Sequence, residues 1–129
     1  MLVTDAGVWV RALLDEDLRG PIRARLRAET AVAAPALIDL EFTNVLRGLL
    51  TKRKIAEPAA ELALADFLLA PIQRYLHEPL VPRVWELRHN LTAYDAAYVA
   101  LAETLGVDLL TIDRGIGGAA GIQCRVLLV

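Results

Sequence analysis

Four acidic residues of this sequence differ from the other charged residues in their surroundings. Most of the 16 acidic residues lie in charged neighbourhoods, whereas these four lie in apolar sequence, three of them where a strand or helix is expected to end. They are Asp5, Glu41, Asp95 and Asp113. A carboxylate among apolar groups is costly unless a cation or hydrogen-bond donors compensate it. If the fold gathers the four, a hard divalent cation such as Mg²⁺ suits them, and such a site can activate water for phosphodiester hydrolysis.

Three of these acids also have an ordinary structural explanation. Asp5 suits the N-cap of a following helix, and Asp95 suits a capping box with Thr92. Asp113, which precedes Arg114-Gly115, suits a turn. Each explanation is reasonable for one residue taken alone. The coincidence of all four positions is what favours a functional site.

Glu41 has the weakest structural explanation of the four. At about 100° per residue, one arc of its predicted helix is polar and indicates the solvent face. That arc consists of Asp39, Thr43 and Arg47. Glu41 lies on the other side, flanked by Leu37 and Val45, with Asn44 close by. This placement predicts a carboxylate turned toward apolar neighbours.

The elements that must position these acids alternate between strands and helices. Strands are expected at residues 1–4, 31–34, 72–76, 108–111 and 125–129. Helices are expected at about 5–14, 17–27, 36–50, 57–69, 80–91 and 92–105, with a glycine-rich turn or short helix at 113–121. This alternation predicts a parallel sheet with helices on both faces. If the strands before Asp5 and Asp113 are parallel neighbours, both carboxylates lie in the crevice beyond the strand ends.

The composition favours a single α/β domain over residues 1–129. Hydrophobic residues make up 56% of the chain and aromatic residues only 5%, so the core is expected to be aliphatic. Cys124 is the only cysteine, which excludes an internal disulfide. No uncharged apolar run approaches the ~20 residues of a membrane span, so we expect an intracellular protein. The net charge of −2 is unusual for a protein that binds nucleic acid.

Four segments of the chain resemble the PIN domains of VapC-type toxins. They are Val3–Ala6, Asp39–Arg47, Leu91–Glu103 and Leu109–Asp113, in the order and spacing of that family. The resemblance implies an α/β fold in the form of a three-layer αβα sandwich around a mostly parallel sheet. It also implies a cytoplasmic, Mg²⁺-dependent endoribonuclease, with Mn²⁺ as a substitute, that acts on RNA. The implied partners are a cognate VapB-type antitoxin, which covers the acidic groove, and a second copy in a homodimer.

The resemblance also implies roles for particular residues. Asp5 and Asp95 match the acids that bind Mg²⁺. Glu41 and Asp113 match the acids that complete the metal cage or orient the attacking water. Two supporting positions match as well: Asn44, which would brace the glutamate, and Thr111, a hydroxyl beside the last acid. Arg11, Arg47 and Arg53 are further candidates for contacts with RNA or antitoxin, although an ordinary surface role is the simpler interpretation.

Gly7 departs from the family pattern, in which many members carry Ser two positions after the first Asp. The missing hydroxyl would lie near the metal or the scissile phosphate, so weaker activity is expected. This departure keeps open an alternative function, a PIN-like binding or assembly module without catalysis.

Overall fold

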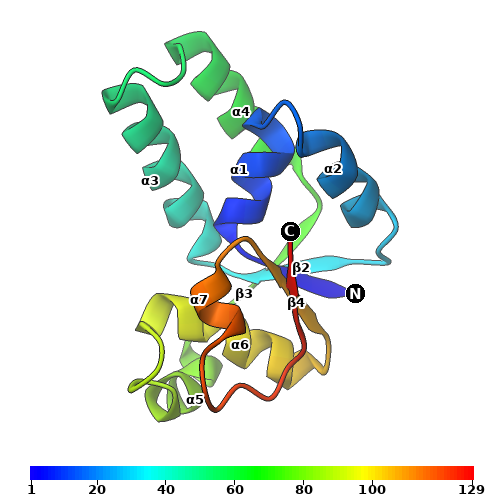
Figure 1. Cartoon of the computed structure of the whole chain (residues 1–129), viewed down its shortest axis with the longest axis vertical. Coiled ribbons are helices and arrows are strands. Elements are labelled where there is room, and N and C mark those ends of the chain that lie inside the picture. Colours follow the sequence, from blue (N-terminus) through cyan, green and yellow to red (C-terminus); the bar gives the residue numbers. More distant parts are fainter.

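The computed structural model describes the whole chain, residues 1–129, and contains a central sheet of five parallel strands (Figure 1). The strands are β1 (Leu2–Thr4), β2 (Val32–Pro35), β3 (Ile72–Tyr75), β4 (Asp108–Thr111) and β5 (Val126–Leu128). Their spatial order is β3-β2-β1-β4-β5, so the first strand of the chain lies in the middle. The predicted α/β class is confirmed, and the sheet is wholly parallel rather than mostly parallel.

Helices cover both faces of this sheet and give three layers (Figure 1). Along the chain they are α1 (Ala6–Leu14), α2 (Arg19–Arg27), α3 (Ile38–Thr51), α4 (Glu57–Leu69), the short 3₁₀ helix η1 (Glu78–Leu80), α5 (Val81–Glu86), α6 (Ala93–Leu105) and α7 (Arg114–Gly117). The helices α1 to α4 form one layer, and α5, α6 and α7 lie on the other side of the sheet. None of these helices is long and apolar enough to cross a membrane.

Local signals in the sequence account for most of the helix ends. Asp5 caps α1 and Thr92 caps α6, each by accepting a backbone N–H. Gly106 ends α6 in the left-handed conformation, with φ of 66°, where a side chain would be strained. The predicted helix at residues 80–91 is the exception, because α5 ends at Glu86 and tighter turns follow. Pro82 lies in the first turn of α5, where its missing N–H would have no partner within the helix.

Three aromatic side chains pack together in the layer formed by α1, α3 and α4. Phe42 of α3 stacks on Phe67 of α4 with ring centroids 4.0 Å apart, and Trp9 of α1 meets Phe67 edge-on at 6.0 Å. On the other side of the sheet, α6 is buried along the continuous run Ala96–Ala102. Helix α3 and helix α6 are therefore both fixed by packing, and both contribute residues to the region beyond β1 and β4.

Candidate active site

Asp5 lies at the carboxyl end of β1 and is buried, with 8% of its surface exposed. One carboxylate oxygen accepts the backbone N–H of Val8 at 2.9 Å, and the other accepts the hydroxyl of Thr111. Because β1 and β4 are parallel neighbours, residues that follow the two strands meet at one edge of the sheet. Burial raises the pKa of Asp5, the charges of Asp113 and Asp95 raise it further, and the two hydrogen bonds oppose the rise.

Asp95 occupies the first turn of α6 and is half-buried. Its backbone N–H donates to the side-chain oxygen of Thr92 at 3.2 Å, so the predicted cap is confirmed. Burial raises the pKa of the Asp95 carboxyl, and the negative charge of Asp113 adds to the effect. Asp95 forms no ion pair within the chain.

Glu41 is half-buried at the border of the packed face of α3, rather than within it. The residues that α3 buries are Ile38, Phe42 and Leu46. Val45, which was expected to lie on an apolar face with Glu41, is 39% exposed. The carboxylate accepts the hydroxyl of Tyr98 at 2.6 Å. Burial raises the pKa of Glu41, as do the charges of Asp95 and Asp5, while the Tyr98 hydrogen bond opposes the rise.

Tyr98 is the site residue that the sequence analysis missed. Asn44 was expected to brace Glu41, but its side chain is exposed and forms no hydrogen bond with the glutamate. Tyr98 lies three residues after Asp95 on α6, so both point from one face of that helix. That spacing was the available signal. The spacing of Asp95 and Tyr98 becomes informative only when the structure places α3 and α6 beside the same strand ends.

Asp113 lies at the exposed rim of this region. Its backbone N–H donates to the side-chain oxygen of Thr111 at 2.9 Å, and its carboxylate accepts the N–H of Gly115 at 2.7 Å. The predicted turn is therefore present. Thr111 links this turn to Asp5, because its hydroxyl donates to Asp5 while its oxygen accepts the N–H of Asp113.

The carboxylates of Asp5, Glu41 and Asp95 border one hollow of about 190 Å³. Its other lining residues are Ala6, Gly7, Asn44, Val45 and Tyr98. No three His, Cys, Asp or Glu side chains come close enough together to hold a metal ion by themselves. Mg²⁺ takes only one or two protein carboxylates and keeps several waters, so this donor set fits it. No basic side chain forms an ion pair with any of the three. Burial raises the pKa of each carboxyl, and the hydrogen bonds within the chain oppose this rise only in part.

The packing of Ile112 leaves little room for a side chain at position 7. A Cβ atom at residue 7 would lie 2.7 Å from both Cγ1 and Cδ1 of Ile112 and 3.3 Å from a carboxylate oxygen of Asp5. The first two distances are too short for carbon atoms in contact, so one of the two residues must move. In this chain Ile112 therefore occupies the space beside Asp5 that a serine side chain would need.

The Tyr98 hydrogen bond gives a first testable prediction. Tyr98→Phe is expected to raise the pKa of Glu41 further, because the half-buried carboxylate loses its donor. It should lower the free energy of unfolding by about 1 kcal/mol, the usual worth of such a bond. NMR titration of the Glu41 carboxyl and urea unfolding measure the two effects. Tyr94→Phe, which alters an exposed ring of the same helix, is the matched control; an equal change in that variant would contradict the prediction.

Comparison with known families identifies the class of protein that has this fold and site. The family model described as the PIN domain matches residues 2–121, which is most of the chain. The chain therefore belongs to the PIN domain family.

Similar proteins narrow the position of the chain within that family. Ribonuclease VapC1 of Mycobacterium tuberculosis is 39% identical over 128 residues, which covers 98% of this chain and 96% of that protein. VapC ribonuclease Mb0985 of Mycobacterium bovis is 36% identical, with coverage of 100% and 98%. These matches place the chain among the VapC-type toxins.

Solved structures agree on the fold. M. tuberculosis VapC20, described as a toxin that cleaves the sarcin-ricin loop, matches with a TM-score of 0.68 at 18% identity over 95% of this chain and 97% of its own. FitAcB from Neisseria gonorrhoeae matches with a TM-score of 0.71 at 17% identity, with coverage of 98% and 96%. At these identities the structures establish the shared architecture alone.

Proposed function

We propose that the chain is a cytoplasmic, Mg²⁺-dependent endoribonuclease, the toxin of a type II toxin–antitoxin pair. The observation that carries the proposal is the hollow beyond β1 and β4, which three buried or half-buried acids line and where none of them pairs with a cation of the chain. Such a site suits metal-dependent phosphodiester hydrolysis, because the phosphate is itself negative and the carboxylates repel it unless a cation lies between them. The ribonuclease names of the relatives support the same activity.

Asp5 and Asp95 are the residues proposed to hold Mg²⁺, or Mn²⁺ in its place. When bound, the metal supplies an activated water and neutralises charge on the scissile phosphate. The hydrogen bonds from Val8 and Thr111 fix the Asp5 carboxylate, so it needs little reorganisation when a cation arrives.

Glu41 and Asp113 are proposed to orient the attacking water from two sides of the hollow. Glu41 is held by Tyr98, and its raised pKa brings the carboxyl closer to the operating pH of a base. Asp113 is exposed at the rim, where a phosphodiester enters, and Thr111 fixes its backbone. Asn44 also lines the hollow and has no partner within the site, so it is proposed to contact the substrate rather than Glu41.

The proposed partners follow from the VapC-type relatives. RNA is the substrate, a VapB-type antitoxin is the inhibitor, and two copies of the chain form a homodimer. The antitoxin is expected to act by covering the acidic hollow, which would exclude both RNA and metal. Mixing purified antitoxin with the chain should therefore suppress cleavage.

The test of the proposed function is cleavage of total cellular RNA by the purified chain. Discrete fragments are expected in Mg²⁺ or Mn²⁺, and none after EDTA removes the metal, because the carboxylates repel the phosphate without it. Gel electrophoresis followed by mapping of fragment ends measures both the requirement and the target. Intact RNA in the presence of bound Mg²⁺ would favour the alternative, a PIN-like module without catalysis.

A further inference from the structure

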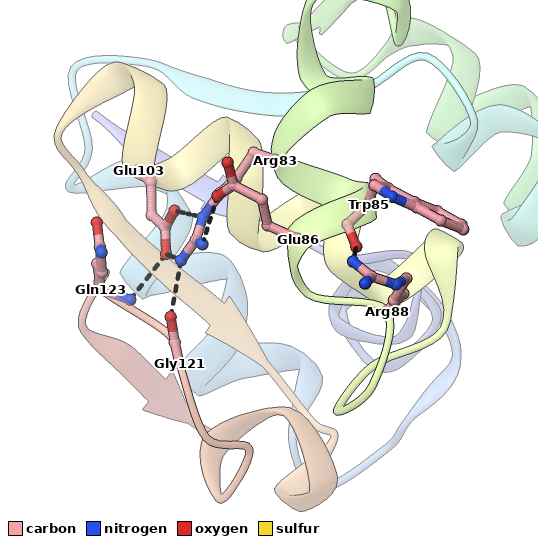
Figure 2. A network of polar contacts seen from close by, with 7 residues as sticks. All are labelled: Arg83, Trp85, Glu86, Arg88, Glu103, Gly121 and Gln123. Carbon is pink, nitrogen blue, oxygen red and sulfur yellow. Dashed lines mark hydrogen bonds and ion pairs between the residues drawn. The ribbon is translucent and has the colours of Figure 1, made fainter.

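The outward face of α5 carries a tryptophan where a polar residue is expected. Leu80, Val84 and Leu87 turn toward the protein, in accord with helical spacing. The opposite stripe begins with Val81 and continues with Trp85, which are 54% and 66% exposed. In Figure 2 the indole of Trp85 points away from the helix and away from the neighbouring polar network. Tryptophan is enriched at surfaces that bind other molecules, because its ring is apolar and its N–H is polar.

Arg88 completes this surface and gives it a positive charge. Its guanidinium carbon lies 4.5 Å from the centroid of the Trp85 ring, and its Nη1 donates to the Trp85 carbonyl at 2.9 Å. No acid pairs with Arg88, because the nearby Glu86 binds Arg83 at 3.0 Å. The two side chains therefore form an aromatic and cationic pair in which the charge of Arg88 has no acidic partner.

Hydrogen bonds on the inner side of α5 position Trp85 and Arg88 relative to the candidate active site. Arg83 of α5 donates from Nε to Glu103 of α6 at 2.7 Å and from Nη2 to the carbonyl of Gly121 at 2.7 Å (Figure 2). Glu103 also accepts the N–H of Gln123 at 2.7 Å. Helix α5 is thus tied to α6, and the first turn of α6 carries Asp95. These contacts connect the helix that carries Trp85 with the helix that carries Asp95.

The segment between Trp85 and Asp95 exposes side chains of the kinds that bind RNA. It passes from Trp85 through the turns after α5 to the start of α6, and only ten positions separate its two ends. Glu86 is exposed and paired with Arg83, and the exposed polar and aromatic residues that follow it are Arg88, His89, Asn90, Thr92 and Tyr94. Tyr94 is 66% exposed and precedes Asp95 directly. Aromatic rings, cations and amides of this kind are the groups that stack bases and bind phosphates of single strands.

We propose that Trp85 and Arg88 form a stacking platform for an unpaired base of single-stranded RNA, on a path that continues along residues 88–94 to the acidic hollow. The inference rests on the proposed function, because it assumes RNA as the substrate. Charge favours RNA as the occupant, since a phosphate neighbouring the stacked base compensates Arg88.

The test is binding of a fluorescein-labelled, single-stranded oligoribonucleotide to the full chain in EDTA, followed by anisotropy. Trp85→Ala is expected to weaken binding by roughly 5- to 100-fold, the usual effect of removing one base-stacking ring. Trp85→Phe should restore most of the affinity. Arg88→Ala should weaken binding and reduce its salt dependence. Arg19→Ala removes an exposed, unpaired arginine at the start of α2, in the other helical layer, and should have little effect.

Intrinsic fluorescence gives a second readout that identifies the ring. Only two tryptophans are present, and Trp9 is buried and donates to Thr4, so quenching by unlabelled RNA reports on Trp85. Unchanged RNA affinity in Trp85→Ala, or no quenching in the wild type, would overturn the platform. Quenching that grows with protein concentration in the absence of RNA would also overturn it and assign the face to a second copy. Neither result depends on cleavage, so the proposed function is judged separately.

Discussion

Asp95→Asn is expected to reduce RNA cleavage by roughly 100-fold or more, the size of effect seen when one electrostatic group of an active site is removed. The carboxylate is proposed to hold Mg²⁺, and an amide is neutral and binds the cation poorly. The fold should remain intact, because the cap of α6 uses the backbone N–H of Asp95 and the hydroxyl of Thr92, which the substitution leaves in place. The loss of activity is therefore chemical in origin.

The same substitution should not destabilise the metal-free protein at neutral pH. Burial and the charge of Asp113 raise the folded-state pKa of Asp95 above its ordinary value of 3.8. A carboxyl with a raised pKa contributes most to stability below its unfolded pKa, and the contribution is lost as pH rises through the folded pKa. At pH 7 the ionised Asp95 therefore lowers stability, and Asn removes that charge. The stability difference between the variant and the wild type should shrink toward pH 4.

Thermal unfolding with and without Mg²⁺ checks this account. Mg²⁺ should raise the Tm of the wild type at pH 7, because a ligand that binds only the folded state stabilises it. The rise should be small in Asp95→Asn, and it should be smaller for the wild type at low pH, where protons compete for the carboxylates. Asp66→Asn, which alters an exposed acid on α4, is the matched control and should behave as the wild type. If Mg²⁺ raised the Tm of Asp95→Asn as much as that of Asp66→Asn, Asp95 would be excluded as a metal ligand.

Gly7→Ser is expected to destabilise the protein by about 1–3 kcal/mol, the usual cost of adding atoms to a packed site. The new Cβ would meet Cγ1 and Cδ1 of Ile112 at 2.7 Å and approach the Asp5 carboxylate at 3.3 Å. Cleavage should fall as well, because the new side chain would press on the Asp5 carboxylate and on Ile112, which lies between Thr111 and Asp113. Restoring the serine found in many relatives should therefore lower activity in this chain.

A double-mutant cycle with Ile112→Ala separates packing from chemistry. Ile112→Ala removes both atoms that the new Cβ would strike, so the two substitutions together should cost less than the sum of their separate effects. Urea unfolding gives the free energies, and the cleavage assay gives the activities. Additive free energies, or a Gly7→Ser variant as stable as the wild type, would show that Ile112 does not hold the position.

The order and type of most elements could be predicted because local signals mark them. Alternating apolar runs and polar segments predicted all five strands, and caps at Asp5 and Thr92 and the glycine stop at Gly106 predicted helix ends. The gathering of the acids at one sheet edge followed from the parallel pairing of β1 with β4. The extent of α5 was predicted wrongly, because the competition between helix and tight turns after Glu86 leaves no periodic signal.

Contacts between distant residues could not be predicted from spacing. Tyr98 and Glu41 are 57 residues apart, and the hydrogen bond between them depends on how α3 and α6 pack. The same is true of Gly7 and Ile112, whose contact turns an apparent loss of a hydroxyl into a requirement for glycine. The family resemblance implied that Asn44 braces Glu41, whereas in the structure the hydrogen-bond partner of Glu41 is Tyr98.

The hydrogen bond between Asp5 and Thr111 also has a consequence for the synthesis of the protein on the ribosome. Its two ends are 106 residues apart, and β1 stays without its neighbour β4 until most of the chain has been synthesised. Long-range strand pairing of this kind forms late, because the intervening chain must first be closed into a loop. The nascent chain therefore cannot assemble its cluster of acids while most of it is still being translated. A nuclease built in this order is inert toward the RNA that surrounds it until its own synthesis is nearly complete.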